Sequence, residues 1–230
     1  NPSVNQSFNP NCMLNRIYTI DIFRAITMLL MIFVNDLWTL TDVPAWMEHA
    51  RADQDFLGFS DIVFPCFLFI VGMSVPYAIR NRISKGESNP QILFHVALRS
   101  VALLVMGIFT VNISDLNVQA SGITVEVFQI LLVTAFFLIW NVYPKAEGGT
   151  KYLVWGLQAL GVAMLIALAF VFKGGKDGTA HLTHQWWGIL GLIGWTYLIT
   201  APIYLFFRKT PILLLVFWGI FTFINIAEHA

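Results

Sequence analysis

Residues 33–72 read FVNDLWTLTDVPAWMEHARADQDFLGFSDIVFPCFLFIVG, a polar loop between two long apolar segments. Each apolar segment is long enough to be a membrane helix, because about 20 mostly apolar residues cross a bilayer. Asn35, His49 and Asp61 lie in or beside this loop. Polar groups at the mouth of a membrane helix bundle are costly and commonly functional. The hairpin therefore indicates both a fold class and a candidate site.

The composition is that of an integral membrane protein. Of the 230 residues, 57% are hydrophobic and 11% are charged, whereas about 25% of an ordinary soluble domain is charged. The net charge is zero, so no field favours nucleic acid, and the lipid bilayer is the expected partner. Cys66 lies inside an apolar run, which argues against a disulfide framework.

Apolar segments along the chain predict an all-α, polytopic transmembrane helical bundle that follows a polar N-terminal segment, 1–16. The seven predicted spans are 17–38, 60–79, 92–113, 124–141, 152–172, 187–207 and 211–228. Gly188, Gly191 and Gly194 recur at three-residue spacing near the start of the sixth span. Small residues at such spacing let membrane helices pack closely, so a packing role is predicted for them.

The distribution of Lys and Arg predicts the orientation, because cytoplasmic loops are enriched in both. The N-terminus is expected to be cytoplasmic, and loop 39–59 is expected to face the opposite side. Eight basic residues fall on the predicted cytoplasmic side, namely Arg16, Arg80, Arg82, Lys85, Lys145, Lys151, Arg208 and Lys209. Three fall on the other side, namely Arg51, Lys173 and Lys176.

The first span carries a polar stripe. At about 100° per residue, Asp21, Arg24 and Asn35 fall within about 60° of each other around the helix. Asp21 and Arg24 are one turn apart and can pair, which lowers the cost of burying either charge. The stripe either locks the helix into the bundle or lines a passage from one face to the other.

His49 is a candidate general base. An imidazole can take a proton from an amine or a hydroxyl and return it later, or it can itself be acylated. A histidine in a loop can also be simply solvated. Asp61 enters the second span after Ser60, which is a candidate helix cap. The Asp61 carboxylate either complements the helix dipole, orients His49 or binds a substrate hydroxyl.

Four arginines, Arg24, Arg80, Arg82 and Arg99, lie towards the predicted cytoplasmic side. Their forked donors suit phosphate groups, and the alternative is that they extend towards lipid headgroups. His181 and His184 have an H-x-x-H spacing. No third ligand accompanies them, so no metal site is predicted.

Several motifs resemble the transmembrane acyltransferase family of heparan-α-glucosaminide N-acetyltransferase and its bacterial relatives. They are RIYTIDIFRAITMLLMIFVND from residue 16, EHA from residue 48 and FSDIVFPCFLFIVGMSVP from residue 59. The resemblance extends to VFQILLVTAFF and to WWGILGLIGWTYLITAPIYLFF, which begin at residues 127 and 186. It therefore covers most of the chain.

The resemblance implies an acyl group donated by cytosolic acetyl-CoA or another acyl-CoA. In the lysosomal enzyme of this family, the acceptor is a terminal glucosamine amine on the opposite face. His49 matches the family's essential histidine, Asn35 matches the asparagine at the exit of the first helix, and Asp61 matches the aspartate of the D-x-V-F-P element. The segment from Asn35 to His49 is longer than in the lysosomal enzyme. The family's further C-terminal helices are absent, so we expect the natural protein to continue beyond Ala230.

The sequence therefore predicts an acyltransferase of the bacterial cytoplasmic membrane that modifies an amino sugar or a glycan hydroxyl at the outer face. His49 is the expected base, Asn35 the donor to the acyl carbonyl, and Asp61 the group that positions His49 or the acceptor. The four arginines are expected to bind the CoA phosphates, and homo-oligomer formation is left open. A transporter or channel along the polar stripe, or a structural membrane subunit, is the alternative.

Overall fold

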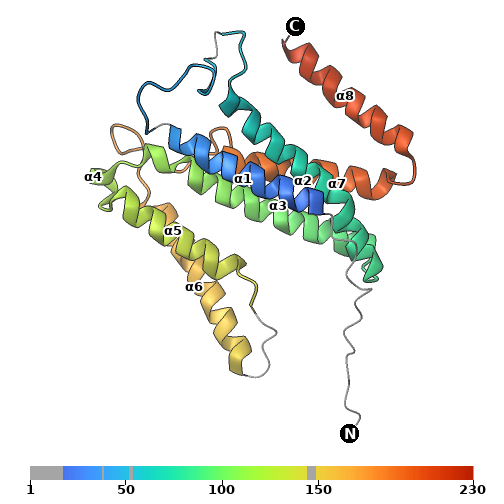
Figure 1. Ribbon diagram of the computed structural model, residues 1–230. Helices are drawn as coiled ribbons and strands as arrows, with labels where there is room; N and C mark the ends of the chain where they lie inside the picture. The colour runs from blue at the N-terminus through green and yellow to red at the C-terminus, as the bar shows by residue number, and fades with distance from the viewer. Residues whose placement is uncertain (1–17, 38, 52–53, 144–148, 230) are drawn as a thin grey trace. The chain divides into compact units, whose positions relative to one another are not determined.

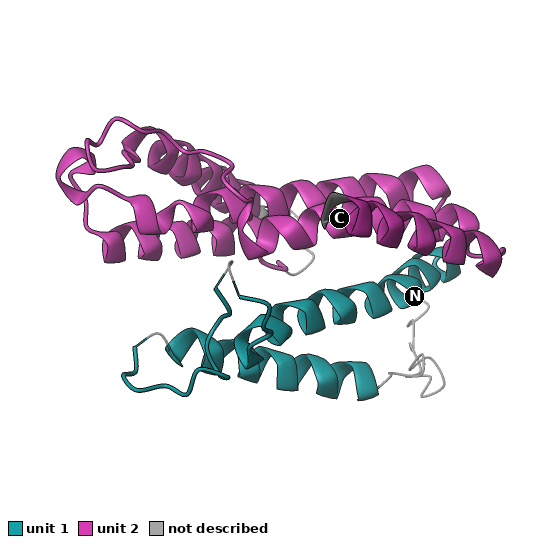
Figure 2. Cartoon of the chain, turned by 90° about the horizontal axis from the view of Figure 1, so that it is seen from above, with its two compact units in different colours: residues 1–85 teal, residues 86–230 magenta. Residues whose placement is uncertain are grey.

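The computed structural model describes residues 18–37, 39–51, 54–143 and 149–229. The chain divides into two compact units, residues 1–85 and 86–230 (Figure 2). The predicted polar segment 1–16 and the basic residue Lys145 lie outside the described residues.

The first unit is a helical hairpin. Helices α1 (Tyr18–Leu37) and α2 (Phe59–Ser84) lie side by side, joined by the loop that carries His49 (Figure 1). A buried cluster joins the two helices at the loop end, and its members are Val34, Leu37 and Val63, with Met47 and Phe59 packed against it. This apolar contact fixes the end of the hairpin from which the loop emerges.

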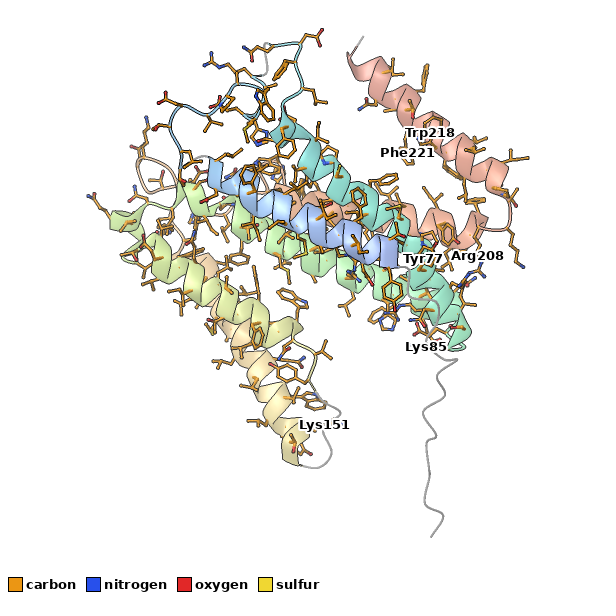
Figure 3. All side chains as sticks on the ribbon, in the orientation of Figure 1. Tyr77, Lys85, Lys151, Arg208, Trp218 and Phe221 are labelled. Atoms are coloured by element: carbon orange, nitrogen blue, oxygen red, sulfur yellow. The ribbon has the colours of Figure 1, made fainter. Side chains whose placement is uncertain are left out.

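The second unit contains two helix pairs and one further long helix. α3 (Asn89–Val111) packs on α7 (Gly188–Phe207), and α5 (Val125–Trp140) packs on α6 (Gly149–Val171). α8 (Pro211–His229) follows α7 after a turn at Arg208 (Figure 3). A 3₁₀ turn, Ile113–Asp115, and a short helix, α4 (Val118–Ser121), connect α3 to α5.

Glycine allows α3 and α7 to approach each other closely. A Cβ atom at Gly107 would overlap the Trp187 carbonyl oxygen and would lie 2.8 Å from the Gly191 Cα atom. A Cβ atom at Gly194 would lie 3.0 Å from the Ser100 carbonyl oxygen. The predicted packing role of Gly191 and Gly194 is therefore confirmed, with Gly107 as their counterpart on α3.

The α5–α6 pair has an aromatic core. Phe128 and Phe172 are 0% and 1% exposed, and their ring centroids lie 6.0 Å apart. Leu132 and Leu168 belong to the same buried cluster. This core holds the second helix pair together, and the Gln158 side chain adds a hydrogen bond from α6 to the Ile139 carbonyl of α5 at 3.4 Å.

Four described helices are long and apolar enough to cross a bilayer, judged by length and composition. They are α2, α3 extended to Asp115, α6 from Thr150, and α7, while α5 and α8 are shorter apolar helices. Trp218 and Phe221 on α8 are 68% and 46% exposed, as apolar side chains facing lipid would be (Figure 3). Each predicted span coincides with one helix, so the helical membrane bundle is confirmed and the protein is an integral membrane protein. That all seven helices cross the membrane stays a prediction.

Candidate functional site

The Asp61 carboxylate lies in the first turn of α2 and accepts three hydrogen bonds. Its Oδ1 atom lies 2.6 Å from His49 Nδ1. Its Oδ2 atom accepts from the backbone N–H groups of Ala50, at 3.0 Å, and Gly58, at 2.9 Å. Hydrogen bonds to charged groups contribute about 1.5–3 kcal/mol each, so this one side chain fixes both the His49 ring and the backbone around it.

Further hydrogen bonds fasten the loop to the start of α2. The Ser60 hydroxyl donates to the Met47 carbonyl at 2.5 Å, and the Phe59 N–H donates to the Trp46 carbonyl at 2.8 Å. Ser60 is therefore not the helix cap that the sequence predicts, because α2 begins at Phe59 and the cap residue is Gly58. The hydroxyl instead holds the loop two residues before His49.

Gly58 is a point of close approach between the loop and α2. A Cβ atom at Gly58 would overlap the Glu48 carbonyl oxygen and would lie 3.3 Å from Asp61 Oδ2. The backbone of the residue before His49 therefore occupies the space that any other side chain at position 58 would need. The sequence signal for this role is a glycine three residues before the helix carboxylate.

The hydrogen bond to Asp61 indicates which ring nitrogen of His49 carries hydrogen. An ionised carboxylate only accepts hydrogen bonds, so Nδ1 is the nitrogen that carries hydrogen. In the neutral imidazole, the lone pair is then on Nε2. The His49 side chain is 43% exposed and that of Asp61 is 24% exposed, so the ring is oriented by the protein and accessible from outside it. An oriented, accessible imidazole of this kind can serve as a general base or as a nucleophile.

Two clefts flank His49. Of the residues that the structure describes, Glu48, His49 and Arg51 line both clefts. The first, here called the apolar cleft, has a volume of about 320 Å³ and is completed by Val34, Leu37, Leu40 and Ser60. The second, here called the polar cleft, has a volume of about 610 Å³ and is completed by Ala45, Ala50, Gln54, Asp55 and Phe56. Glu48, Arg51, Gln54 and Asp55 were not predicted as site residues from the sequence, because charged and amide side chains in loops are usually just solvated.

The third residue of the predicted trio, Asn35, lies on an exposed face of α1. Val34 and Leu37 line the apolar cleft, whereas Asn35 is not among the described residues that line either cleft. The structure therefore brings His49 and Asp61 together and leaves the Asn35 side chain outside their hydrogen-bond network.

The predicted basic residues are divided between the two units. Arg24 Nη1 lies 3.7 Å from Asp21 Oδ1, at the predicted one-turn spacing, and Arg24 Nη2 donates to the Ser74 hydroxyl at 3.0 Å. The hydrogen bond to Ser74 ties α1 to α2, whereas the pair with Asp21 lies within α1. Arg80 and Arg82 lie near the end of α2. In the second unit, the Arg99 guanidinium lies 5.4 Å from the centre of the Tyr197 ring.

A polar network in the second unit was not foreseen from the sequence. Asn112, at the end of α3, is 2% exposed, and its Nδ2 atom donates to the carbonyls of Ile108 and Thr183, both at 2.7 Å. Gln185 Nε2 donates to Asp115 Oδ2 at 2.8 Å. The network fastens the loop that carries His181 and His184 to the end of α3. Among the described residues, no group of three or more His, Cys, Asp or Glu side chains is placed to hold a metal ion.

Comparison with known proteins gives two curated relatives, both named heparan-alpha-glucosaminide N-acetyltransferase. The human protein is 34% identical over 97 residues, which are 42% of this chain and 14% of the relative. The mouse protein is 30% identical over 98 residues, which are 43% of this chain and 14% of the relative. The chain therefore matches only a small part of each relative's length. No solved structure matches the chain.

The sequence also matches a family profile described as "Domain of unknown function (DUF5009)", over residues 16–226. The match covers both units, including α1, the His49 loop and α2. The resemblance to heparan-α-glucosaminide N-acetyltransferase is thus supported by two relatives in addition to the motifs. Because the profile spans nearly the whole chain, the chain belongs to the DUF5009 family.

Proposed function

We propose that the protein is a membrane acyltransferase that moves an acetyl or other acyl group from cytosolic acyl-CoA to an amino sugar or glycan hydroxyl on the opposite face. The observation that carries this proposal is the 2.6 Å contact between His49 Nδ1 and Asp61 Oδ1 beside two clefts. The names of the human and mouse relatives give it independent support.

In the proposed reaction, His49 is the general base. The lone pair on Nε2 accepts a proton from the acceptor while the acceptor nitrogen or oxygen attacks the thioester carbonyl. A C–N or C–O bond forms, the C–S bond breaks, and Nε2 then gives the proton to the departing CoA thiolate. Proton transfer by a positioned side chain contributes about 10²–10⁴-fold to a rate. A path through an acyl-histidine would use the same nitrogen.

Asn35 is proposed as the donor to the acyl carbonyl, whose oxygen gains negative charge during the attack. One such donor is worth about 10²–10³-fold in rate. Support for this role comes from the family resemblance alone, because Asn35 is not among the described residues that line either cleft.

The CoA phosphates are proposed to meet Arg24, Arg80, Arg82 or Arg99 on the cytoplasmic side. Arg24 lies ten residues before Val34, or about 15 Å along α1, so it belongs to the end of the hairpin away from His49. The excess of Lys and Arg on that side supports a cytoplasmic donor and an acceptor at the outer face.

The test is transfer of labelled acetyl from acetyl-CoA to a panel of amino sugars by the purified full-length protein. We expect His49→Ala to abolish transfer while the protein is still expressed and folded, with a lower unfolding temperature because the bond to Asp61 is lost. The matched control is His181→Ala, which removes an exposed histidine from the second unit. Turnover by His49→Ala at the rate of the unmodified protein would contradict the catalytic assignment.

The same purified protein, reconstituted into proteoliposomes, tests the alternative that the protein is a transporter. Proteoliposomes that move a solute across the membrane without consuming acyl-CoA would favour a pathway along Asp21, Arg24 and Asn35. Acetyl transfer that requires His49, without such flux, would favour the enzyme.

A further inference from the structure

The two clefts beside His49 differ in chemistry, although they share a wall. Glu48, His49 and Arg51 line both clefts, so these three side chains separate one from the other. A group-transfer reaction brings two different substrates to one base from different directions. A base in the wall between two clefts has the placement that such a reaction requires.

The side chains found in only one cleft give that cleft its character. The described residues that line only the apolar cleft are Val34, Leu37, Leu40 and Ser60. Val34 and Leu37 are 5% and 8% exposed, and the Ser60 hydroxyl donates to the Met47 carbonyl. Gln54, Asp55 and Phe56 belong only to the polar cleft. Phe56 is 50% exposed, so one apolar ring lies beside a carboxylate and an amide in a cleft open to solvent.

We infer that His49 separates a donor subsite from an acceptor subsite, and that Asp55 makes the acceptor subsite selective for a protonated amine. The apolar cleft takes the acyl group and the adjoining thioester. In the polar cleft, Asp55 pairs with the ammonium group of the acceptor, and Phe56 contacts the apolar face of its ring. This inference rests on the proposed function, and its new element is the assignment of Asp55 as the residue that selects an amine over a hydroxyl.

The charges of the lining residues support the assignment of the polar cleft to the acceptor. The described residues that line the polar cleft include two carboxylates, Glu48 and Asp55, and one guanidinium, Arg51. Glu48 and Arg51 are common to both clefts, so among the described lining residues Asp55 is the charged side chain that distinguishes them. A cationic acceptor is attracted to this cleft at long range and pairs there through a charge-assisted hydrogen bond. A neutral sugar gains neither contribution.

The chemical step balances within this arrangement. The bound ammonium group first releases one proton to solvent. The resulting amine nitrogen attacks the thioester carbonyl, a C–N bond forms and the C–S bond breaks. The second nitrogen proton passes to His49 Nε2 and from there to the CoA thiolate, so the products are an amide and free CoA thiol. No oxidant, reductant or metal is required.

The test compares Asp55→Asn with Asp42→Asn in the full-length protein, using acetyl-CoA and glucosamine. Asp42 lies in the same loop and lines neither cleft, and its φ of 58° is one that asparagine also adopts readily. We expect Asp55→Asn to raise the KM for glucosamine about tenfold, with kcat and the KM for acetyl-CoA unchanged. Asp42→Asn should leave all three constants unchanged.

Direct binding separates this inference from the proposed function. Titration calorimetry of the unmodified protein with glucosamine, and with glucose as the neutral analogue, should give tighter binding of glucosamine, lost in Asp55→Asn. Binding that depends on Asp55 without acetyl transfer would refute the proposed function and retain the subsite. Transfer with the same glucosamine KM in both variants would overturn the subsite and retain the transfer. A protein that neither binds glucosamine nor transfers acetyl would overturn both.

The donor side has its own variant. Leu40 is 59% exposed and lines only the apolar cleft, so Leu40→Trp can narrow that cleft without disturbing a packed core. We expect it to lower the rate with butyryl-CoA relative to acetyl-CoA about tenfold and to leave the KM for glucosamine unchanged. A changed glucosamine KM with an unchanged preference between acyl groups would reverse the assignment of the two clefts.

Discussion

A side chain at Gly58 and the carbonyl oxygen of Glu48 would occupy the same space. Gly58 is also the helix cap of α2 and donates its N–H to Asp61. The path of the loop past His49 therefore depends on a missing side chain as much as on the hydrogen bonds to Asp61.

The first prediction concerns this contact. We expect Gly58→Ala to displace the Glu48 backbone, weaken the contact between His49 and Asp61 and lower acetyl transfer at least tenfold, since overpacking typically costs about 1–3 kcal/mol. Transfer rate and thermal unfolding in detergent are the measurements. Gly72→Ala in α2 is the control, because nothing lies within 4 Å of a Cβ atom there. Equal activity of the two variants would show that the loop does not need this close approach.

The second prediction concerns the charge of Asp61. In Asp61→Asn, the amide NH₂ must face His49 Nδ1–H, Ala50 N–H or Gly58 N–H, all of which are donors. We expect the imidazole to lose its orientation and the rate to fall about 10²–10⁴-fold. The readout is kcat for acetyl transfer, with Asp177→Asn in the second unit as a charge-matched control. Activity of Asp61→Asn within a factor of two of the control would contradict the orienting role.

The third prediction concerns the α3–α7 pair. We expect Gly107→Ala to destabilise the protein by about 1–3 kcal/mol, because the new methyl group overlaps the Trp187 carbonyl oxygen. The measurement is unfolding at increasing concentrations of a denaturing detergent, followed by tryptophan fluorescence. Gly156→Ala in α6 meets nothing within 4 Å and should unfold as the unmodified protein does. An unchanged unfolding midpoint in Gly107→Ala would mean that α3 and α7 can move apart enough to admit the methyl group without loss of stability.

The fourth prediction concerns Asn112. Asn112→Ala removes the acceptor for the Thr183 N–H and the donor to the Thr183 carbonyl. Each buried polar group left without a partner costs about 1–3 kcal/mol, so we expect a lower unfolding midpoint and faster hydrogen exchange of the Thr183 amide. Asn141→Ala, at an exposed position, is the control. Slow exchange at Thr183 in the Asn112 variant would show that another group holds the loop.

The helices could be predicted because length and apolar content decide whether a segment can cross a bilayer, and neither depends on contacts elsewhere in the chain. His49 and Asp61 could be singled out because polar residues beside apolar spans are costly. Their mutual hydrogen bond was one of several alternatives. It depends on the path of the loop, which has no periodicity from which that path could be predicted.

Asn35 shows which part of the site could not be predicted from the sequence. At about 100° per residue, Asn35 lies about 100° around α1 from Val34 and about 160° from Leu37. The relative directions of these side chains were therefore available from the sequence. The face of α1 on which the loop folds was not, because the buried cluster of Val34, Leu37 and Val63 decides it through contacts between α1 and α2.

Asp61 accepts hydrogen bonds from both Ala50 and Gly58, and this has a consequence for how the loop sequence can vary. These two residues flank segment 51–57, which supplies Gln54, Asp55 and Phe56 to the polar cleft. Because both ends are fastened to one carboxylate, insertions, deletions or exchanged residues within the segment can reshape the cleft while the imidazole stays in place. Surface loops tolerate such length changes at little thermodynamic cost. Preference for a new acceptor can therefore evolve, or be engineered, by changes in this segment that leave His49 and Asp61 in place.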